Sequence, residues 1–292
     1  MTNNFPKISI VTPNYNQANF LEQTILSVLT QNYPNLEYII IDGGSTDGSV
    51  DIIKKYENQL AYWVSEPDNG LYDAVKKGFN HSTGEIMAWI NSDDIYHRNA
   101  FFTVAEIFQT LPQVDWIQGL PTFYDEKGRN VSTGAFKRWS KYEYYCGEYR
   151  WIQQESVFWR QSLWEKVTGN FRTDLKYAGD LLLWMNFFRH AHLYSLPFFL
   201  SGFRYRSSNQ FSLEHIADYH EEALAVLAHE PVSAADKKII RRYRMVKKII
   251  DFLNKLKIRK TDWIVNRYKN RHFNYSPIIR FNIRTQKFEM EE

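Results

Sequence analysis

The sequence predicts an α/β fold with a mostly parallel sheet, because strand patterns alternate with helical patterns over its first hundred residues. Four runs, at residues 8–11, 36–41, 61–64 and 85–90, are nearly continuous in apolar and β-branched residues. The segments between them, such as 71–79, carry apolar residues at helical spacing. Strands that are apolar on both faces are typical of a parallel sheet with helices on both sides, so we expect that architecture.

Length and composition indicate a folded globular protein. The chain has 292 residues, of which 44% are hydrophobic and 24% charged, which excludes a wholly disordered, collagen-like or disulfide-stapled chain. The one cysteine, Cys146, cannot form an internal disulfide and fits a reducing compartment. We find no secretory signal and no run of the roughly 18 apolar residues that a spanning helix needs. We therefore expect a cytoplasmic protein.

Charge is distributed unevenly along the chain. Residues 237–271 hold 14 Lys/Arg against 2 Asp/Glu, whereas residues 1–236 have a net negative charge. Residues 234–257 combine these cations with apolar residues at helical spacing, which predicts an amphipathic basic helix. Such a helix can lie on an anionic membrane surface, pack on the protein, or mediate self-association, and these alternatives stay open. No motif that reads nucleic acid accompanies the charge, so we expect no nucleic-acid partner.

Acidic residues follow three of the four predicted strands. Asp42 follows the second strand, Asp68 the third, and the Asp93-Asp94 pair the fourth. In an open α/β sheet, ligands bind beyond the carboxyl ends of the strands, where such loops converge. Adjacent carboxylates suit a hard divalent cation shared with substrate phosphates. A turn with an aspartate capping the next helix is the simpler alternative for an isolated pair.

Four motifs, taken together, point to one family. Residues 12–16 (TPNYN), 41–48 (IDGGSTDG), 65–74 (SEPDNGLYDA) and 91–94 (NSDD) resemble in order and spacing the amino-terminal half of glycosyltransferase family 2. These are inverting sugar-nucleotide transferases of GT-A fold. The resemblance covers residues 7–100 closely and continues less closely to about residue 212. It implies a GT-A catalytic domain at 1–212, with a donor-nucleotide half at 1–100 and an acceptor half at 101–212. Residues 213–292 would form a helical basic C-terminal extension.

The resemblance also implies roles for individual residues. The donor nucleotide would contact Thr12, Pro13, Tyr15, Asp42, Asp68, Lys77 and, through the ribose, Asp93. Asp94 would bind the Mn²⁺ or Mg²⁺ that bridges the diphosphate. Several relatives have a second acidic residue where this chain has Gly43, and the family has Asn where this chain has Lys76. The identity of the base therefore stays open, with uridine preferred.

An inverting transfer needs a general base that deprotonates the acceptor hydroxyl. Asp180 lies in a segment, residues 177–184, that resembles the place of the family's catalytic aspartate, and Glu155 and Asp174 are the reserve candidates. A helix-capping aspartate is the structural alternative for Asp180. Residues 151–156 resemble the acceptor-side segment, where we expect Trp151, Gln153 and Gln154 to bind the acceptor.

The expected function is an inverting, metal-dependent transfer of a sugar from a nucleoside-diphosphate sugar to a glycan or lipid-linked acceptor. The family's usual setting implies surface polysaccharide or lipopolysaccharide synthesis, at the inner face of the membrane if the basic helix docks there. Two alternatives are a sugar nucleotidyltransferase and a non-catalytic nucleotide-sugar or glycan-binding module. A nucleotidyltransferase usually has a glycine-rich basic loop after its first strand, and residues 12–17 are not such a loop.

Overall fold

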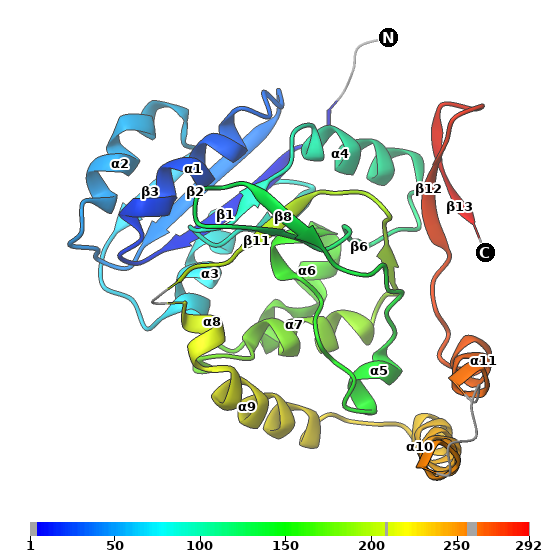
Figure 1. Cartoon of the computed structure of the whole chain (residues 1–292). Coiled ribbons are helices and arrows are strands. Elements are labelled where there is room, and N and C mark those ends of the chain that lie inside the picture. The colour runs from blue at the N-terminus through cyan, green and yellow to red at the C-terminus, as the bar shows by residue number, and fades with distance from the viewer. Residues whose placement is uncertain (1–4, 208–209, 256–261, 292) are drawn as a thin grey trace.

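The computed structural model describes residues 5–207, 210–255 and 262–291, and its centre is a seven-stranded sheet covered by helices (Figure 1). The strand order is β10-β6-β9-β4-β1-β2-β3, and a four-stranded sheet has the order β5-β11-β7-β8. The strands are β1 (Ile8–Asn14), β2 (Leu36–Asp42), β3 (Tyr62–Ser65), β4 (Ile86–Trp89), β5 (Ile95–Tyr96), β6 (Trp116–Gln118), β7 (Thr122–Tyr124), β8 (Asn130–Thr133), β9 (Val157–Arg160), β10 (Leu193–Ser195), β11 (Ser201–Arg204), β12 (Ile278–Asn282) and β13 (Lys287–Glu291).

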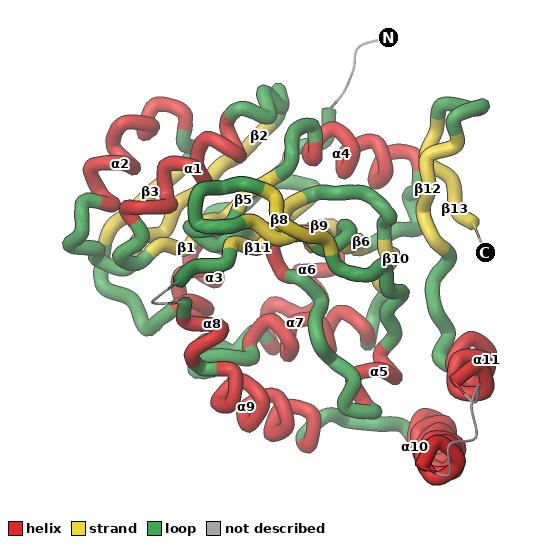
Figure 2. The backbone as a smooth tube through the Cα atoms, in the orientation of Figure 1, coloured by secondary structure: helices red, strands yellow, loops and turns green. Residues whose placement is uncertain are grey.

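Helices follow most of these strands, as the tube in Figure 2 shows. They are α1 (Ala18–Leu29), α2 (Ser49–Tyr56), α3 (Leu71–Asn80), α4 (Ala100–Thr110), α5 (Lys141–Tyr145), α6 (Gln161–Val167), α7 (Gly179–Phe188), α8 (Phe211–Glu214), α9 (Ile216–Ala228), α10 (Ala234–Lys255) and α11 (Asp262–His272). The predicted strands and helices of the first hundred residues are thus present. The main difference is that β1 continues to Asn14, so the TPN segment ends a strand instead of opening a loop.

The two faces of the large sheet build two separate hydrophobic cores, because successive side chains of a strand point to opposite faces. Ile8 and Ile10 of β1 pack in the core that α1, α2 and α4 cover. Val11 packs in the core on the other face, with α3, α6 and α7. The second core is rich in tryptophan, and Trp89, Trp116, Trp159 and Trp184 are all fully buried there. Aromatic residues in this part of the chain therefore mainly form the core.

The sheet is parallel except at one strand. β1 pairs in parallel with β2 and β4, and β2 pairs in parallel with β3. β9 runs antiparallel between β4 and β6. The carboxyl ends of β1, β2, β3 and β4 consequently lie along one edge, and their loops converge there. The expectation of a mostly parallel sheet with helices on both faces is confirmed.

The carboxyl-terminal segment contains more than helices. α10 and α11 pack together, and the antiparallel hairpin β12–β13 contacts β10 and α4. Glu148, which follows α5, accepts hydrogen bonds from Lys247, Lys269 and Tyr243 of the two helices. These contacts fix the helix pair next to α5. Within the described part of the chain, no helix is both long and apolar enough to cross a membrane.

Candidate active site

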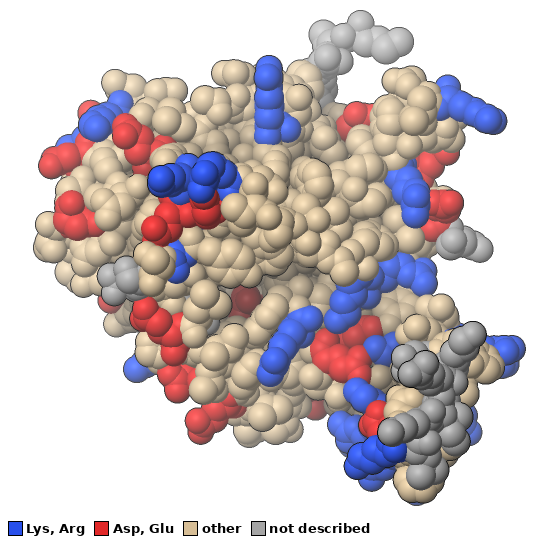
Figure 3. Space-filling model, in the orientation of Figure 1, with Lys and Arg blue, Asp and Glu red and all other residues tan. Residues whose placement is uncertain are grey.

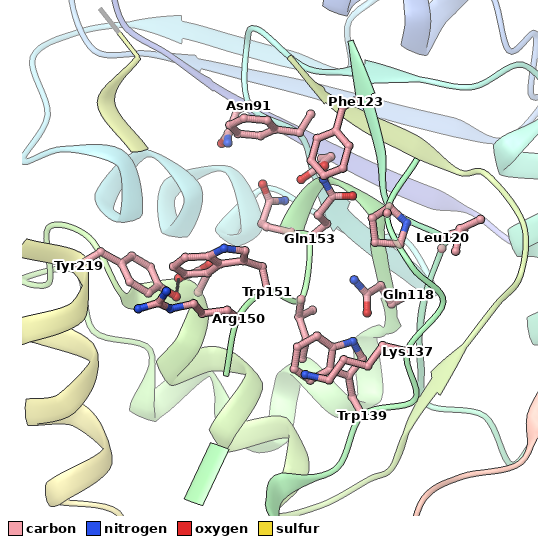
Figure 4. Close-up of a pocket in the computed structure, with 18 of the residues that line it drawn as sticks. Asn91, Gln118, Leu120, Phe123, Lys137, Trp139, Arg150, Trp151, Gln153 and Tyr219 are labelled. Atoms are coloured by element: carbon pink, nitrogen blue, oxygen red, sulfur yellow. Dashed lines mark hydrogen bonds between the residues drawn. The ribbon is translucent and has the colours of Figure 1, made fainter. Parts of the chain in front are cut away.

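A cavity of about 500 Å³ lies beyond the carboxyl ends of the central strands. Its lining residues come from α3, the loop after β4, the 118–123 and 134–139 segments, the 150–155 segment, α7 and α9. Figure 4 shows Asn91 and Phe123 at one end and Lys137 and Trp139 at the other. Segments from both halves of the predicted catalytic domain therefore meet at this cavity.

Asp42 is a fully buried carboxylate at the end of β2. It accepts hydrogen bonds from Asn14 Nδ2 at 2.6 Å, from the hydroxyl and backbone amide of Ser45, and from the hydroxyl of Ser65. Burial opposes ionisation, but these hydrogen bonds prevail and lower the pKa of Asp42. Asp42 is thus an ionised side chain that holds the three loops after β1, β2 and β3 together.

Asp68 lies directly in front of Gly43. A Cβ atom on Gly43 would come within 2.8 Å of Asp68 Oδ2, so a larger residue at position 43 would displace this carboxylate. Burial raises the pKa of Asp68, whose Oδ1 accepts a hydrogen bond from the amide of Gly70. A carboxylate from the next loop therefore occupies the space beside Gly43.

The other predicted nucleotide contacts differ in accessibility. Thr12 is fully buried and its hydroxyl bonds Tyr38 at 3.0 Å, so its side chain faces the protein interior. Pro13 is also buried, whereas Tyr15 is 62% exposed at the loop surface. Lys77 lies 3.0 Å from Glu66, and this hydrogen bond raises the pKa of Lys77. The structure thus leaves the Tyr15 ring exposed to a planar ligand, whereas the buried Thr12 side chain does not face the space where a nucleotide could bind.

Asp93 and Asp94 occupy different environments. Asp93 lies 3.2 Å from Arg206 Nε and has a side chain that is 16% exposed. Asp94 is 1% exposed, and its Oδ1 accepts a hydrogen bond from the backbone amide of Arg204. Its Oδ2 is buried without a hydrogen-bond partner among the described residues. Burial, together with the charges of Asp93 and Glu155, holds the pKa of Asp94 well above its usual range.

A divalent cation fits the chemistry of this corner. Buried oxygens of Asn91, Asp94 and Glu155 lack hydrogen-bond partners within the described residues, and the carboxylates repel one another. A hard cation that takes oxygen ligands would relieve both costs. Over residues 5–207, 210–255 and 262–291, no three His, Cys, Asp or Glu side chains are grouped so that they could hold a metal by themselves. A cation here would need further ligands from a substrate.

Asp180 lies in the first turn of α7 and lines the cavity. Its Oδ1 accepts a hydrogen bond from the Leu181 amide at 2.7 Å and lies 3.4 Å from the hydroxyl of Tyr219 and 3.5 Å from that of Tyr72. Burial raises the pKa of Asp180 to about 6. Asp180 is not the N-cap residue, which is Ala178, but its carboxylate does accept an amide of the first turn of α7, so this helix-end contact coexists with a place at the cavity.

Glu222 of α9 holds the loop that precedes Asp180. Its carboxylate accepts hydrogen bonds from the backbone amides of Lys176, Tyr177 and Ala178 at 3.0, 2.7 and 2.6 Å. Sequence reasoning did not single out Glu222 or Tyr219, because their partners lie more than thirty residues away and α9 reads only as an amphipathic helix. Residues assigned to the extension therefore help to build the cavity, although the boundary at 212 stays a prediction.

Glu155 is a second buried carboxylate at the cavity. It is 3% exposed, lines the cavity, and has an Oε1 without a hydrogen-bond partner in the described part of the chain. Burial and the charges of Asp93 and Asp180 raise the pKa of Glu155 to about 8. The other reserve candidate, Asp174, has a side chain that is 67% exposed and paired with Arg172, and it does not line the cavity.

The three predicted acceptor residues all line the cavity. Trp151 is 40% exposed and stacks on His220 with ring centroids 5.7 Å apart. Gln154 donates a hydrogen bond to the carbonyl of Trp89, and the side-chain oxygens of Gln153 and Gln154 have no partner among the described residues. Trp151 thus offers an exposed aromatic face at the cavity, whereas the two glutamine oxygens are buried in its wall.

The fold is an α/β fold of the GT-A type. The structure aligns with S. aureus TarS in complex with UDP-GlcNAc with a TM-score of 0.63 at 20% identity, covering 80% of this chain and 70% of that one. It aligns with the mannosyltransferase PcManGT of Pyrobaculum calidifontis, in complex with GDP-Man and Mn²⁺, with a TM-score of 0.60 at 18% identity, covering 82% and 68%. These likenesses confirm the predicted fold.

The chain belongs to glycosyltransferase family 2. The family model described as Glycosyl transferase family 2 matches residues 9–180, which is more than half of the chain. An uncharacterized glycosyltransferase of Nostoc sp. is 36% identical over 107 residues, covering 36% of this chain and 33% of the relative. A Bacillus subtilis protein assigned to teichuronic acid biosynthesis, TuaG, is 36% identical over 102 residues, covering 34% and 40%. The match to Nostoc sp. thus spans about a third of that relative's length.

Proposed function

We propose that this protein is an inverting glycosyltransferase that moves a sugar from a nucleoside-diphosphate sugar to a hydroxyl of a glycan or lipid-linked acceptor. One observation carries the proposal. Glu155 and Asp180 line one cavity together with Asn91, which opens the loop that carries Asp93 and Asp94. A cation-binding carboxylate pair and a separate base are what this reaction requires.

The donor nucleotide would bind over the loops that Asp42 holds together. Tyr15 is exposed enough to stack on the base, and Asp68 offers a carboxylate oxygen in front of Gly43. A carboxylate accepts hydrogen bonds, and uracil and guanine both present a ring N–H donor. TarS binds UDP-GlcNAc and PcManGT binds GDP-Man, which is compatible with either base. We propose a UDP-sugar as the donor.

The residues that would hold a divalent cation are Asp94, through its unpartnered Oδ2, and Asp93, whose carboxylate is the more exposed of the two. When bound, Mn²⁺ or Mg²⁺ would offset the negative charge that develops on the departing diphosphate. Asp93 would also contact the ribose, as the family resemblance implies.

Asp180 would act as the general base. With a pKa of about 6 it is mainly ionised at neutral pH, and a cavity-lining carboxylate can reach an acceptor hydroxyl. The acceptor oxygen forms a bond to the anomeric carbon while the bond to the diphosphate oxygen breaks. The bonding electron pair leaves with the nucleoside diphosphate, and the hydroxyl proton passes to Asp180. Attack opposite the leaving group inverts the anomeric configuration.

The acceptor would bind at Trp151, Gln153 and Gln154, which line the cavity. The assignment of TuaG to teichuronic acid biosynthesis, and the family as a whole, support a role in bacterial surface polysaccharide synthesis. We place the enzyme in the cytoplasm, at the inner face of the membrane when its acceptor is lipid-linked.

Incubation with candidate donors and Mn²⁺ tests the proposal. We expect release of a nucleoside diphosphate, and a rise in melting temperature with that diphosphate only when the cation is present. Exchange of pyrophosphate would instead identify a sugar nucleotidyltransferase. Binding of a donor with no turnover in the presence of acceptor glycans would indicate a non-catalytic binding module.

A further inference from the structure

α10 has two apolar faces, and only one of them is covered. Ile240, Tyr243 and Ile250 are buried. Ile240 and Tyr243 belong to a small core that they form with Tyr142 and Phe273. On the opposite side, Met245, Ile249 and Phe252 are 51%, 60% and 61% exposed. Their spacing of four and three residues places them on one helix face. No described part of the chain covers this row of three residues, which we call the outer row.

Cations border the outer row. By helical periodicity, Arg241 and Lys248 lie on one side of it, and Arg242 lies on the other. All three are exposed and make no ion pair with any described residue. Lys and Arg side chains also gather over α10 and α11 in the space-filling view (Figure 3). The helix holds eight Lys/Arg against two Asp/Glu, and Asp236, one of the two, is buried.

We propose that the outer row of α10 docks on an anionic membrane surface, with Met245, Ile249 and Phe252 entering the headgroup region. A helix with an apolar stripe between cationic borders is suited to a lipid surface, where the stripe leaves water and the borders meet anionic headgroups. α10 lies at the edge of the molecule, away from the large sheet, so a planar surface can approach it (Figure 1).

Charge and polarity argue against a second copy of the chain, and against a nucleic acid, as the partner of the outer row. Two copies joined through the outer row by a two-fold axis would bring the cationic borders of one copy against those of the other. A nucleic acid would satisfy the cations but leave three large apolar side chains against phosphates. The membrane is the partner whose charge and polarity both match.

This inference deepens the proposed function, since docking would hold the enzyme where a lipid-linked acceptor lies, and that consequence rests on the proposed function. Docking itself needs neither donor nor metal. A failure of membrane docking would therefore leave the transfer activity unaffected. Membrane docking would likewise be detected in a protein that transfers no sugar.

Flotation of the full chain with vesicles tests the inference. We expect binding to vesicles of phosphatidylcholine with phosphatidylglycerol, little binding to phosphatidylcholine alone, and weaker binding as salt is raised. The double variant Ile249→Ser with Phe252→Ser should reduce the partition coefficient at least about tenfold. Its matched control is Leu224→Ser on α9, an apolar residue that is 59% exposed and should bind as the wild type does.

Charge is tested separately with Arg241→Gln and Lys248→Gln, each expected to weaken binding to anionic vesicles roughly fivefold. The control pair Lys54→Gln and Lys166→Gln, both exposed and distant from α10, should change it little. All variants should keep the wild-type melting temperature. Equal binding by the Ile249/Phe252 variant and the wild type would overturn the inference, as would self-association that this variant alone abolishes.

Discussion

The guanidinium of Arg206 lies 3.2 Å from the carboxylate of Asp93, and only 7% of the Arg206 side chain is exposed. Arg206 also donates a hydrogen bond from Nη1 to Gln17 at 2.8 Å, which joins the loop after β11 to the loop after β1. A fixed positive charge thus occupies one side of the carboxylate pair to which we assign the divalent cation. The guanidinium of Arg206 and a divalent ion at this site would therefore compete for the carboxylate of Asp93.

Replacing Arg206 should therefore change metal affinity. In Arg206→Gln the divalent ion no longer competes with a guanidinium, so we expect Mn²⁺ to bind about three- to tenfold more tightly without nucleotide. Electron paramagnetic resonance of free Mn²⁺ measures this affinity directly. Arg129→Gln is a suitable control, because that arginine pairs with Asp125 at the surface. Unchanged or weaker Mn²⁺ binding in Arg206→Gln would mean that Asp93 is not a ligand.

Removal of the proposed base should separate binding from chemistry. Asp180→Asn keeps the size of the side chain but cannot accept the acceptor proton, so we expect kcat to fall about a hundred- to ten-thousandfold. Donor affinity, measured by calorimetry, should stay within about threefold. Asp174→Asn is the matched control, since Asp174 is exposed and outside the cavity. Full transfer by Asp180→Asn would remove Asp180 from the mechanism.

The pH profile of the reaction should report the same carboxylate. Burial raises the pKa of Asp180 to about 6, and only its ionised form can accept a proton. The rate constant kcat/KM should therefore fall about tenfold per pH unit below this pKa and level off above it. Initial rates between about pH 4.5 and 8 test this. A flat profile across that range would show that no group with such a pKa limits the reaction.

Glu222 should affect the rate by positioning Asp180. Glu222→Ala leaves the amides of Lys176, Tyr177 and Ala178 without their acceptor, which would loosen the segment before Asp180. We expect kcat to fall about ten- to a hundredfold with little change in donor affinity. Glu222→Gln, which keeps one acceptor oxygen, should recover part of the rate. Glu221→Ala, at an exposed neighbouring position, serves as the control. An equal loss in donor affinity would contradict a role limited to Asp180.

Local signals predicted where the acidic loops of the donor half lie in the fold, while their roles stay predictions. Asp42 and Asp93 follow apolar strand runs, and parallel strands bring such loops to one edge whatever the remaining chain does. Because position 43 is glycine, the sequence did not indicate which residue would contact the base. In the structure, the carboxylate of Asp68 from the next loop lies beside Gly43. The sequence could not indicate this replacement, because it depends on how two loops approach each other.

The supporting residues were beyond sequence reasoning for the same reason. Arg206 reads as one cation among many, and its pairing with Asp93 appears only when β11 lies beside β5. Glu222 reads as a solvated residue on an amphipathic helix. Thr12 belongs to a family motif, yet its hydroxyl faces Tyr38 in the interior. Contacts between distant segments decide these roles, and no local pattern encodes them.

The central claim is that the Asp93–Asp94 pair binds the donor diphosphate through a divalent cation. Phosphorus NMR of UDP titrated with the protein, with and without Mg²⁺, tests it most directly. We expect the β-phosphorus signal to shift only when the cation is present, with the effect lost in Asp94→Asn and kept in Asp180→Asn. An identical shift without the cation, or in Asp94→Asn, would contradict the account.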